Sequence, residues 1–125
     1  MTKKEIALKY LEFLENGNIM EVVNLFREDA IIDSPIYGIM NVKAFYQELN
    51  SDTTNSELKF LGLFEDNDTH HIALYFNYKW TLKNHQNVEF DVVDVIEFDT
   101  VNKISRLKII YDTVTARKIV EQLEY

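Results

Sequence analysis

The chain has 125 residues, of which 46% are hydrophobic and 27% are charged. This length predicts one domain, spanning residues 1–125, with enough apolar side chains to bury a core. Cysteine is absent, which excludes disulfides, thiolate nucleophiles and zinc-thiolate or iron–sulfur sites. Thirteen Lys and Arg against 21 Asp and Glu give a net charge of −8, so we expect no nucleic-acid partner, because a polyanion would be repelled.

The sequence also predicts no contact with a membrane. Its longest apolar stretches, Ile36–Met40 and Phe60–Phe64, are far shorter than the roughly 20 residues that cross a bilayer. At the N-terminus, Glu5, Lys9 and Glu12 interrupt what would have to be the apolar core of a signal peptide. These features favour a cytoplasmic protein.

The first half of the chain has mainly a helical pattern, in which apolar residues recur every three or four positions. Gly17 tolerates the left-handed conformation that ends a helix. Pro35 ends the first strand, because proline cannot donate a hydrogen bond to a neighbouring strand. In chain order we predict a helix at Lys3–Glu15, a helix with the apolar stripe Ile19, Val22, Val23 and Phe26, a strand at Ala30–Ile32 and a helix at about Val42–Leu49.

After the polar segment Asn50–Asn55, which we expect to be a loop, the pattern changes to the alternation that is typical of strands. In the second of these strands one face carries five large apolar or aromatic residues, from Ile72 to Trp80. A helical pattern returns at the end of the chain. The predicted elements are strands near Ser56–Phe64, His71–Leu82, Glu89–Asp99 and Ile104–Tyr111, and a helix at Thr113–Glu124.

This order of elements predicts an α+β fold. Four consecutive strands joined by short turns form an antiparallel meander, with the helices on one face. A strongly twisted sheet of this kind curls around a helix and encloses a space. Because the inner face of the predicted sheet is rich in aromatic residues, their packing decides whether that space is filled or open.

Asp94 is the most informative single residue. It shares a strand face with Phe90, Val92 and Ile96, whereas the neighbouring acidic residues fall on the other face. Burial disfavours a charged carboxylate and raises its pKa, and a neutral carboxylic acid can donate a hydrogen bond to an oxyanion. The alternatives are a hydrogen-bonded structural acid, or a strand register shifted by one residue, which would turn Asp94 outward.

Tyr10 is a second candidate. It lies in the apolar stripe of the first helix, one turn from Ile6 and Leu14, so its hydroxyl enters the interior and needs a partner. A tyrosine in such a stripe is usually a core residue. If Tyr10 and Asp94 share one cavity, both become candidate hydrogen-bond donors.

Other polar residues have simpler interpretations. Asp112 ends the last strand and is expected to cap the final helix. His70 and His71 begin a strand and point to opposite sides, while His85 lies in a hairpin loop. No set of residues has the spacing of a metal site, so we expect neither a metal nor a cofactor.

Several short motifs along most of the chain occur in a characteristic order and spacing. They are Tyr10–Asn18, Leu25–Ala30, Pro35, Gly38, Val93–Asp99, Lys103–Leu107 and Ile110–Asp112. Through them the chain resembles the nuclear-transport-factor-2-like (NTF2-like) superfamily, specifically its SnoaL-like and ketosteroid-isomerase-like branch. The resemblance implies a cone, in which a curved, mostly antiparallel sheet wraps around the long first helix and a hydrophobic cavity opens at one end. Isomerases, cyclases, dehydratases and non-catalytic proteins share this fold.

The resemblance also implies site residues. Ketosteroid isomerases hold an oxyanion with a tyrosine of the first helix and a protonated aspartate of the sheet. Tyr10, seven residues before Gly17, matches that tyrosine. Asp94, four residues before Phe98, matches that aspartate.

The general base of that family is not matched. It is an aspartate immediately before a proline, whereas this chain has Ser34 before Pro35 and an acid one place earlier, at Asp33. A neutral serine cannot shuttle a proton as a carboxylate does. Adjacent strand residues point to opposite faces, so Asp33 is a candidate base only if the chain turns it inward at the proline.

We therefore expect a hydrophobic cavity that binds a small apolar molecule bearing a carbonyl or phenol group, with Asp94 and Tyr10 as donors. An isomerase or cyclase would also need a base. The alternatives are a non-catalytic binder, or a dimeric interaction module with a filled cavity. We expect a homodimer that uses Val93 and Val95 on the outer sheet face. The predicted cavity residues are Ser34, Phe76, Tyr78, Trp80, Val92, Leu107, Ile109 and Tyr111.

Overall fold

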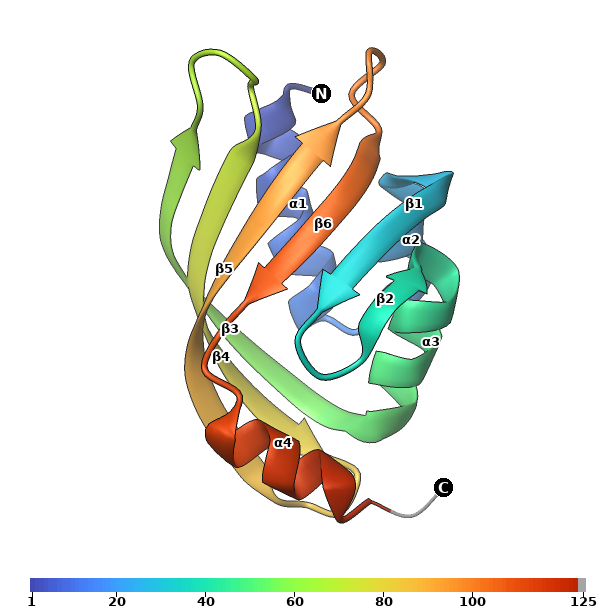
Figure 1. Cartoon of the computed structure of the whole chain (residues 1–125), viewed down its shortest axis with the longest axis vertical. Helices are drawn as coiled ribbons and strands as arrows, with labels where there is room; N and C mark the ends of the chain where they lie inside the picture. Colours follow the sequence, from blue (N-terminus) through green and yellow to red (C-terminus); the bar gives the residue numbers. More distant parts are fainter. Residues whose placement is uncertain (124–125) are drawn as a thin grey trace.

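A computed structural model describes residues 1–123, which form four helices and one six-stranded sheet. The strands follow the order β2-β1-β6-β5-β4-β3 across the sheet (Figure 1). The elements are α1 (Lys3–Glu15), α2 (Ile19–Asn24), β1 (Phe26–Ser34), β2 (Gly38–Asn41), α3 (Val42–Asp52), β3 (Thr53–Glu65), β4 (Ile72–Leu82), β5 (Asn87–Phe98), β6 (Ile104–Ile110) and α4 (Val114–Glu121).

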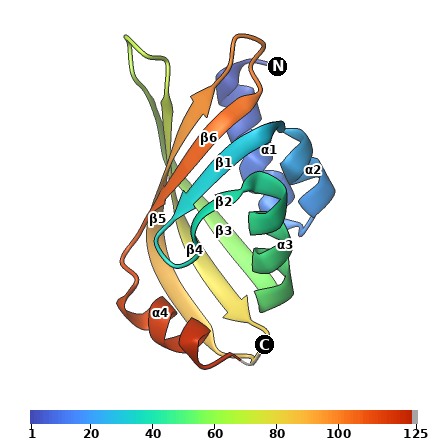
Figure 2. The same ribbon diagram turned by 45° about the vertical axis from the view of Figure 1, so that its right-hand side comes forward.

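The sheet is curved, open and mostly antiparallel. Strands β3 to β6 form the predicted meander, β1 joins β6 in parallel, and β2 pairs antiparallel with β1. Figure 2 shows α1, α2 and α3 on one side of the sheet, and Figure 1 shows α4 at the end of the molecule that lies away from the N-terminus. The predicted α+β cone, with a sheet wrapped around the first helix, is confirmed.

The first helix forms where the sequence predicts it. Thr2 and Glu5 make a capping box, in which each side chain accepts a hydrogen bond from the other residue's backbone N–H. Gly17, with φ of 71°, reverses the chain after the helix. The buried stripe of α1 lies against the concave face of the sheet and comprises Ile6, Ala7, Tyr10, Leu11 and Leu14.

The predicted alternation of buried and more exposed residues in β4 and β5 is also confirmed. Every second residue of β4, from Ile72 to Leu82, is buried. Asp94 pairs with Leu74 across the two strands and is only 1% exposed. The predicted register is therefore correct, and Asp94 points to the concave side of the sheet.

The structure differs from the predictions for the first half of the chain in three places. Phe26 belongs to a strand and not to the second helix, because it pairs with Ile104 of β6. The strand predicted at Ala30–Ile32 extends over all of β1. Strand β2 was not predicted, since its four residues are partly or fully exposed and carry no alternating pattern; the pairing with β1 forms it.

The loop predicted at Asn50–Asn55 is also absent. Helix α3 continues to Asp52, and β3 begins at Thr53. These polar residues find partners in the fold, because Tyr37 donates a hydrogen bond to Asp52 and Trp80 Nε1 donates one to Thr53 Oγ1. The last helix ends at Glu121, and the predicted end at Glu124 lies outside the described residues.

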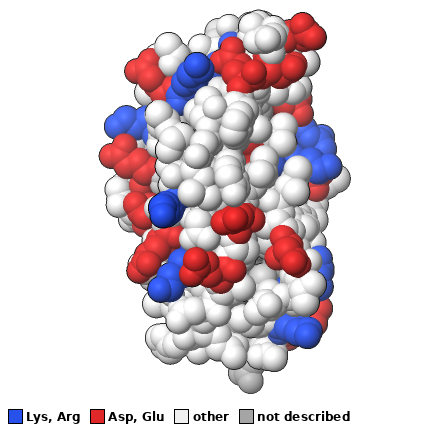
Figure 3. All heavy atoms as spheres, turned by 90° about the vertical axis from the view of Figure 1, so that its left-hand side faces the viewer, with Lys and Arg blue, Asp and Glu red and all other residues white. Residues whose placement is uncertain are grey.

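The surface reflects the negative net charge. Acidic side chains are spread over the face shown in Figure 3, around an uncharged area in its upper half. Within residues 1–123 no helix combines the length and the hydrophobicity that crossing a membrane requires.

Candidate functional site

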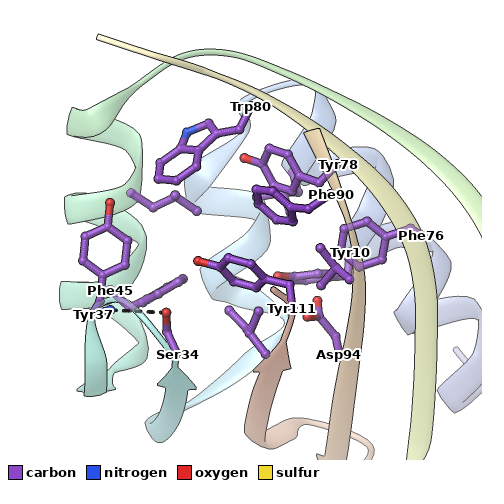
Figure 4. Close-up of a pocket in the computed structure, with 14 residues that line it drawn as sticks. Tyr10, Ser34, Tyr37, Phe45, Phe76, Tyr78, Trp80, Phe90, Asp94 and Tyr111 are labelled. Atoms are coloured by element: carbon purple, nitrogen blue, oxygen red, sulfur yellow. Dashed lines mark hydrogen bonds between the residues drawn. The ribbon is translucent and has the colours of Figure 1, made fainter. Parts of the chain in front are cut away.

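A cavity lies between the concave face of the sheet, α1 and α3 (Figure 4). Its lining is almost entirely aromatic or aliphatic, and its free volume is about 40 Å³. The lining residues are Tyr10, Leu14, Ser34, Tyr37, Phe45, Leu49, Phe76, Tyr78, Trp80, Phe90, Val92, Asp94, Ile109 and Tyr111. Segments far apart in the sequence therefore meet around one cavity.

Asp94 is the only carboxylate among these lining residues, and none of them is a histidine. Its Oδ1 atom is buried without a hydrogen-bond partner among the described residues. Burial raises the pKa of Asp94 well above its ordinary value, because desolvation penalises the ionised form. A raised pKa widens the pH range over which the carboxyl group is neutral and can donate its proton into the cavity.

Tyr10 lies beside Asp94 in the cavity wall (Figure 4). Its hydroxyl is 2.6 Å from that of Tyr46, a fully buried residue of α3 outside the cavity lining. Burial raises the pKa of both tyrosines, and the nearby Asp94 raises both further. Both hydroxyls are therefore neutral. Because only one of them can donate in the shared bond, the pair keeps one further O–H proton, which Tyr10 can direct into the cavity when Tyr46 is the donor.

A stack of aromatic rings forms part of the cavity wall. The rings of Phe90 and Tyr111 are 4.3 Å apart between centroids and nearly parallel, at 13°. The ring of Tyr78 continues the stack, 5.7 Å from Phe90 at 20°. Tyr111 follows the last strand and immediately precedes the turn into α4.

Tyr78 is held in place by a hydrogen bond. Its hydroxyl is 2.7 Å from Ser56 Oγ, between the paired strands β3 and β4. Burial raises the pKa of Tyr78 to about 12. The same cause raises the pKa of Tyr111, so neither hydroxyl ionises near neutral pH and neither is available there as a carboxylate-like base.

Ser34 and Asp33 lie on opposite sides of β1. Ser34 is 4% exposed, lines the cavity and accepts a hydrogen bond of 3.4 Å from the backbone N–H of Tyr37. The carboxylate of Asp33 pairs with Arg106 at 3.4 Å and does not line the cavity. The chain does not turn Asp33 inward at Pro35, because buried and more exposed residues alternate from Ala30 to Ser34, the last residue of the strand.

The structure brings together most of the other predicted cavity residues. Phe76, Tyr78, Trp80, Val92, Ile109 and Tyr111 all line the cavity. Leu107 is an exception: it has the predicted inward orientation, but it is fully buried in the core and not part of the lining.

Sequence reasoning missed two tyrosines. Tyr46 supplies the partner of Tyr10, and Tyr37 forms part of the cavity wall. A signal for Tyr46 was present, since it recurs with Val42 and Leu49 at helical spacing in α3. Tyr37 follows a proline in a turn, where no periodicity indicates the direction of a side chain.

The remaining candidates have structural roles or surface positions. Asp112 Oδ1 accepts a hydrogen bond from the backbone N–H of Val114, the first residue of α4, although Thr113 is the N-cap residue and makes no side-chain capping bond. His70 and His85 adopt positive φ angles in turns. Across residues 1–123, no three His, Asp or Glu side chains cluster in a way that could hold a metal ion.

Comparisons with known proteins identify the fold. No family model and no curated protein sequence matches the chain. Among solved structures, TerC co-crystallised with polyporic acid is similar with a TM-score of 0.79 and 16% identity, over 96% of this chain and 98% of TerC. A SnoaL-like protein from Shewanella denitrificans has a TM-score of 0.76 and 12% identity, over 97% and 98% of the two chains. An NTF2-like protein from Cytophaga hutchinsonii has a TM-score of 0.71 and 13% identity, over 90% and 92%.

These likenesses cover nearly the whole chain, at identities that establish the fold alone. The chain therefore has the NTF2-like fold of the SnoaL-like and ketosteroid isomerase-like proteins, as its sequence motifs predict.

Proposed function

We propose that this chain of NTF2-like fold binds a small apolar molecule in its aromatic cavity and polarises a carbonyl or phenol oxygen of that molecule. Protonated Asp94 and the hydroxyl of Tyr10 are the two hydrogen-bond donors. Hydrogen bonds from buried donors to an oxygen that gains negative charge are strong, because little water competes for them.

The observation that carries this proposal is the burial of the Asp94 carboxyl group with one oxygen left without a hydrogen-bond partner among the described residues. An apolar wall surrounds its carboxyl group, and Oδ1 has no partner among the described residues. Burying an unsatisfied polar group costs about 1–3 kcal/mol, and a purely structural core would favour an apolar residue at this position. A ligand oxygen that accepts the proton of Asp94 would offset part of this cost.

A ligand of useful size requires the cavity to expand. Small-molecule sites usually measure about 300–1,000 Å³, compared with about 40 Å³ of free volume here. Tyr111 is the side chain best placed to make room, because it is only partly buried and leads into α4. Helix α4 is itself attached to the turn after β1 through Arg117 Nη2, which donates a hydrogen bond of 2.6 Å to the carbonyl of Pro35.

The test is a titration with 2-naphthol, a flat apolar phenol, followed by fluorescence and calorimetry. We expect saturable binding that Asp94→Asn and Tyr10→Phe each weaken by about 1–3 kcal/mol. The matched control is Tyr75→Phe, which removes a tyrosine hydroxyl from the outer sheet face, where it donates to Asp91 at 3.4 Å. Equal affinity in Asp94→Asn, Tyr10→Phe and the control would contradict the proposal.

One observation favours a second candidate, an interaction module with a filled cavity. The free volume of about 40 Å³ has room for little more than water. In that case 2-naphthol does not bind, and Asp94→Asn and Tyr10→Phe change only the stability of the protein.

A further inference from the structure

We infer that Ser34 forms a second polar subsite of this cavity and selects flat apolar ligands that carry a second oxygen at the end away from Asp94. The inference rests on the proposed function above, because it requires a molecule whose first oxygen is bound by Asp94 and Tyr10. Ser34 then acts in ligand recognition: its hydroxyl donates a hydrogen bond, and no proton is transferred.

The sheet places Ser34 and Asp94 in one row across three strands. Asp33 of β1 pairs with Lys108 of β6, and Ser34 and Ile109 are the next residues of these parallel strands. Ile109 pairs in turn with Asp94 of β5. Neighbouring strands are about 4.8 Å apart, so the backbones of Ser34 and Asp94 are about 10 Å apart. A bound molecule therefore reaches both side chains only if it has polar groups at two separate positions.

The side chain of Ser34 faces the cavity because β1 alternates. Ala30 and Ile32, which precede it on the same face of the strand, are fully buried, and Ser34 itself is 4% exposed. Figure 4 shows the Ser34 hydroxyl at the cavity, on the opposite side from Asp94 and Tyr10. Ser34 is thus the first polar residue in a row of core positions, where a hydroxyl costs free energy unless it is hydrogen-bonded.

The hydroxyl of Ser34 keeps a proton to donate. Its oxygen accepts a hydrogen bond from the backbone N–H of Tyr37 at 3.4 Å, which is long for such a bond. A serine hydroxyl that accepts a bond still has its own proton, and among the described residues Ser34 donates that proton to no other group. A ligand oxygen would supply the missing acceptor.

Other polar side chains of the cavity wall have partners outside the cavity lining. They are Tyr37 with Asp52, Tyr78 with Ser56, and Trp80 with Thr53. Tyr111 is a further hydroxyl of the wall, and in Figure 4 its ring lies between the side of Ser34 and the side of Asp94. That ring must move aside for a ligand, as the proposed function already requires. Ser34 is therefore the donor that the sheet holds in place at this end.

The spacing defines the class of ligand. A hydrogen bond of about 2.8 Å at each end leaves room for one or two flat rings between the two polar groups of the row. The ligand is therefore a flat molecule of one or two rings with oxygens at opposite ends, such as a diphenol or a quinone.

The experiment compares diphenols with molecules of the same size in which a methyl group replaces the second hydroxyl. Calorimetry measures 2,6-naphthalenediol against 6-methyl-2-naphthol, and hydroquinone against 4-methylphenol. We expect the wild-type protein to bind at least one diphenol about tenfold more tightly than its methyl counterpart, because the methyl group leaves the Ser34 donor without an acceptor. Ser34→Ala should abolish this preference by weakening the diphenol about tenfold, with the dissociation constant of 2-naphthol changed less than about twofold. A merely structural role of Ser34 would change both ligands alike.

Two further variants separate Ser34 from its surroundings. Tyr111→Ala removes the other hydroxyl of the wall and should keep the preference for the diphenol. Ser105→Ala is the matched control, because Ser105 lies outside the cavity lining and donates to the carbonyl of Glu97 at 3.2 Å. It should change the affinity for none of these ligands.

The outcomes separate this inference from the proposed function. If 2-naphthol binds and Asp94→Asn weakens it, but the wild type prefers neither diphenol, the inference is overturned and the proposed function stands. A preference that survives Ser34→Ala, or that Tyr111→Ala abolishes, also overturns the inference. Failure of every ligand to bind both the wild type and Tyr111→Ala overturns the inference and the proposed function together. If Ser34→Ala does not fold, the preference measured in the wild type and in Tyr111→Ala decides.

Discussion

The hydroxyl groups of Tyr10 and Tyr46 lie 2.6 Å apart in the fully buried interior, and they join helices α1 and α3. Tyr10 faces the cavity, whereas Tyr46 supports it from behind. Any change at one of these residues therefore acts on the hydrogen bonding of the other.

This pair predicts non-additive stability. Tyr46→Phe and Tyr10→Phe each leave one buried hydroxyl without its partner, which should cost about 1–3 kcal/mol of unfolding free energy. The double variant removes both groups and should cost clearly less than the sum of the two. Urea unfolding of the four proteins measures the coupling. Additive losses would mean that the hydroxyls do not depend on each other.

Asp94 predicts a pH-dependent difference between the wild type and Asp94→Asn. Desolvation raises the pKa of Asp94 in the folded protein, so its contribution to stability is complete below the unfolded pKa of about 3.9 and is lost as pH rises through the folded pKa. Asparagine does not ionise. The stability of Asp94→Asn relative to wild type should therefore increase above pH 4, by up to about 1.4 kcal/mol per pH unit.

Urea unfolding between pH 4 and pH 8 tests this expectation. Asp91→Asn is the control, because Asp91 is exposed on the outer face of the same strand. A constant difference between Asp94→Asn and wild type across this range would show that Asp94 has the same pKa in the folded and unfolded chains.

Removing the ring of Tyr111 should open the cavity. Tyr111→Ala takes away the outer member of the stack with Phe90, and we expect it to bind 2-naphthol about tenfold more tightly, equivalent to about 1.4 kcal/mol. Because the ring is only partly buried, the loss of unfolding free energy should be about 1–3 kcal/mol, below that of a fully buried aromatic residue. Calorimetry and urea unfolding measure the two effects. Val114→Ala, at an exposed position of α4, is the control, and weaker binding by Tyr111→Ala would contradict the prediction.

A carboxylate at position 34 should give the cavity a base. Ser34 lines the cavity and is 4% exposed, so Ser34→Asp places an acid against a ligand held by Asp94. We expect this variant to accelerate deuterium exchange at the carbons next to the carbonyl of 2-tetralone, an aromatic ketone, measured by nuclear magnetic resonance in deuterated water. Stability should fall by a few kcal/mol because the new carboxylate is desolvated. Ser51→Asp, on the exposed surface of α3, should change neither property.

The outer face of the sheet predicts a homodimer. Val93 lies opposite Ile110 on β6 and Tyr75 on β4, and Val95 lies opposite Ala73. Ile110 is 48% exposed, so these residues form an apolar strip that a second copy can cover. Ile110→Glu should convert a dimer to a monomer in sedimentation experiments. Val101→Glu, in the β5–β6 turn, should not, and a wild-type protein that sediments as a monomer would refute the prediction.

Local patterns in the sequence determined most of the fold. The three- and four-residue spacing of apolar residues defined α1, and strict alternation in β4 and β5 placed Asp94 on the concave side. Such patterns are reliable where one face of a helix or strand is buried along several helical turns or several residue pairs. Each further buried position must again be apolar, so the pattern is repeated.

Only the tertiary structure decided which polar groups meet. Tyr10 and Tyr46 are 36 residues apart, and Trp80 reaches Thr53 across 27. The sequence presented Asp52 as part of a loop, although partners from two other segments, Tyr37 and Lys83, surround it. Hydrogen-bond partners distant in the sequence leave no periodic signal.

The same limit applies to the cavity itself. The sequence indicated its aromatic walls, including Phe76, Tyr78 and Trp80. Its small free volume depends on how Phe90 and Tyr111 stack, and the exclusion of Asp33 depends on the alternation of β1 continuing from Ala30 to its last residue. Packing and strand regularity are set by contacts across the whole fold, and for that reason residue types alone did not determine them.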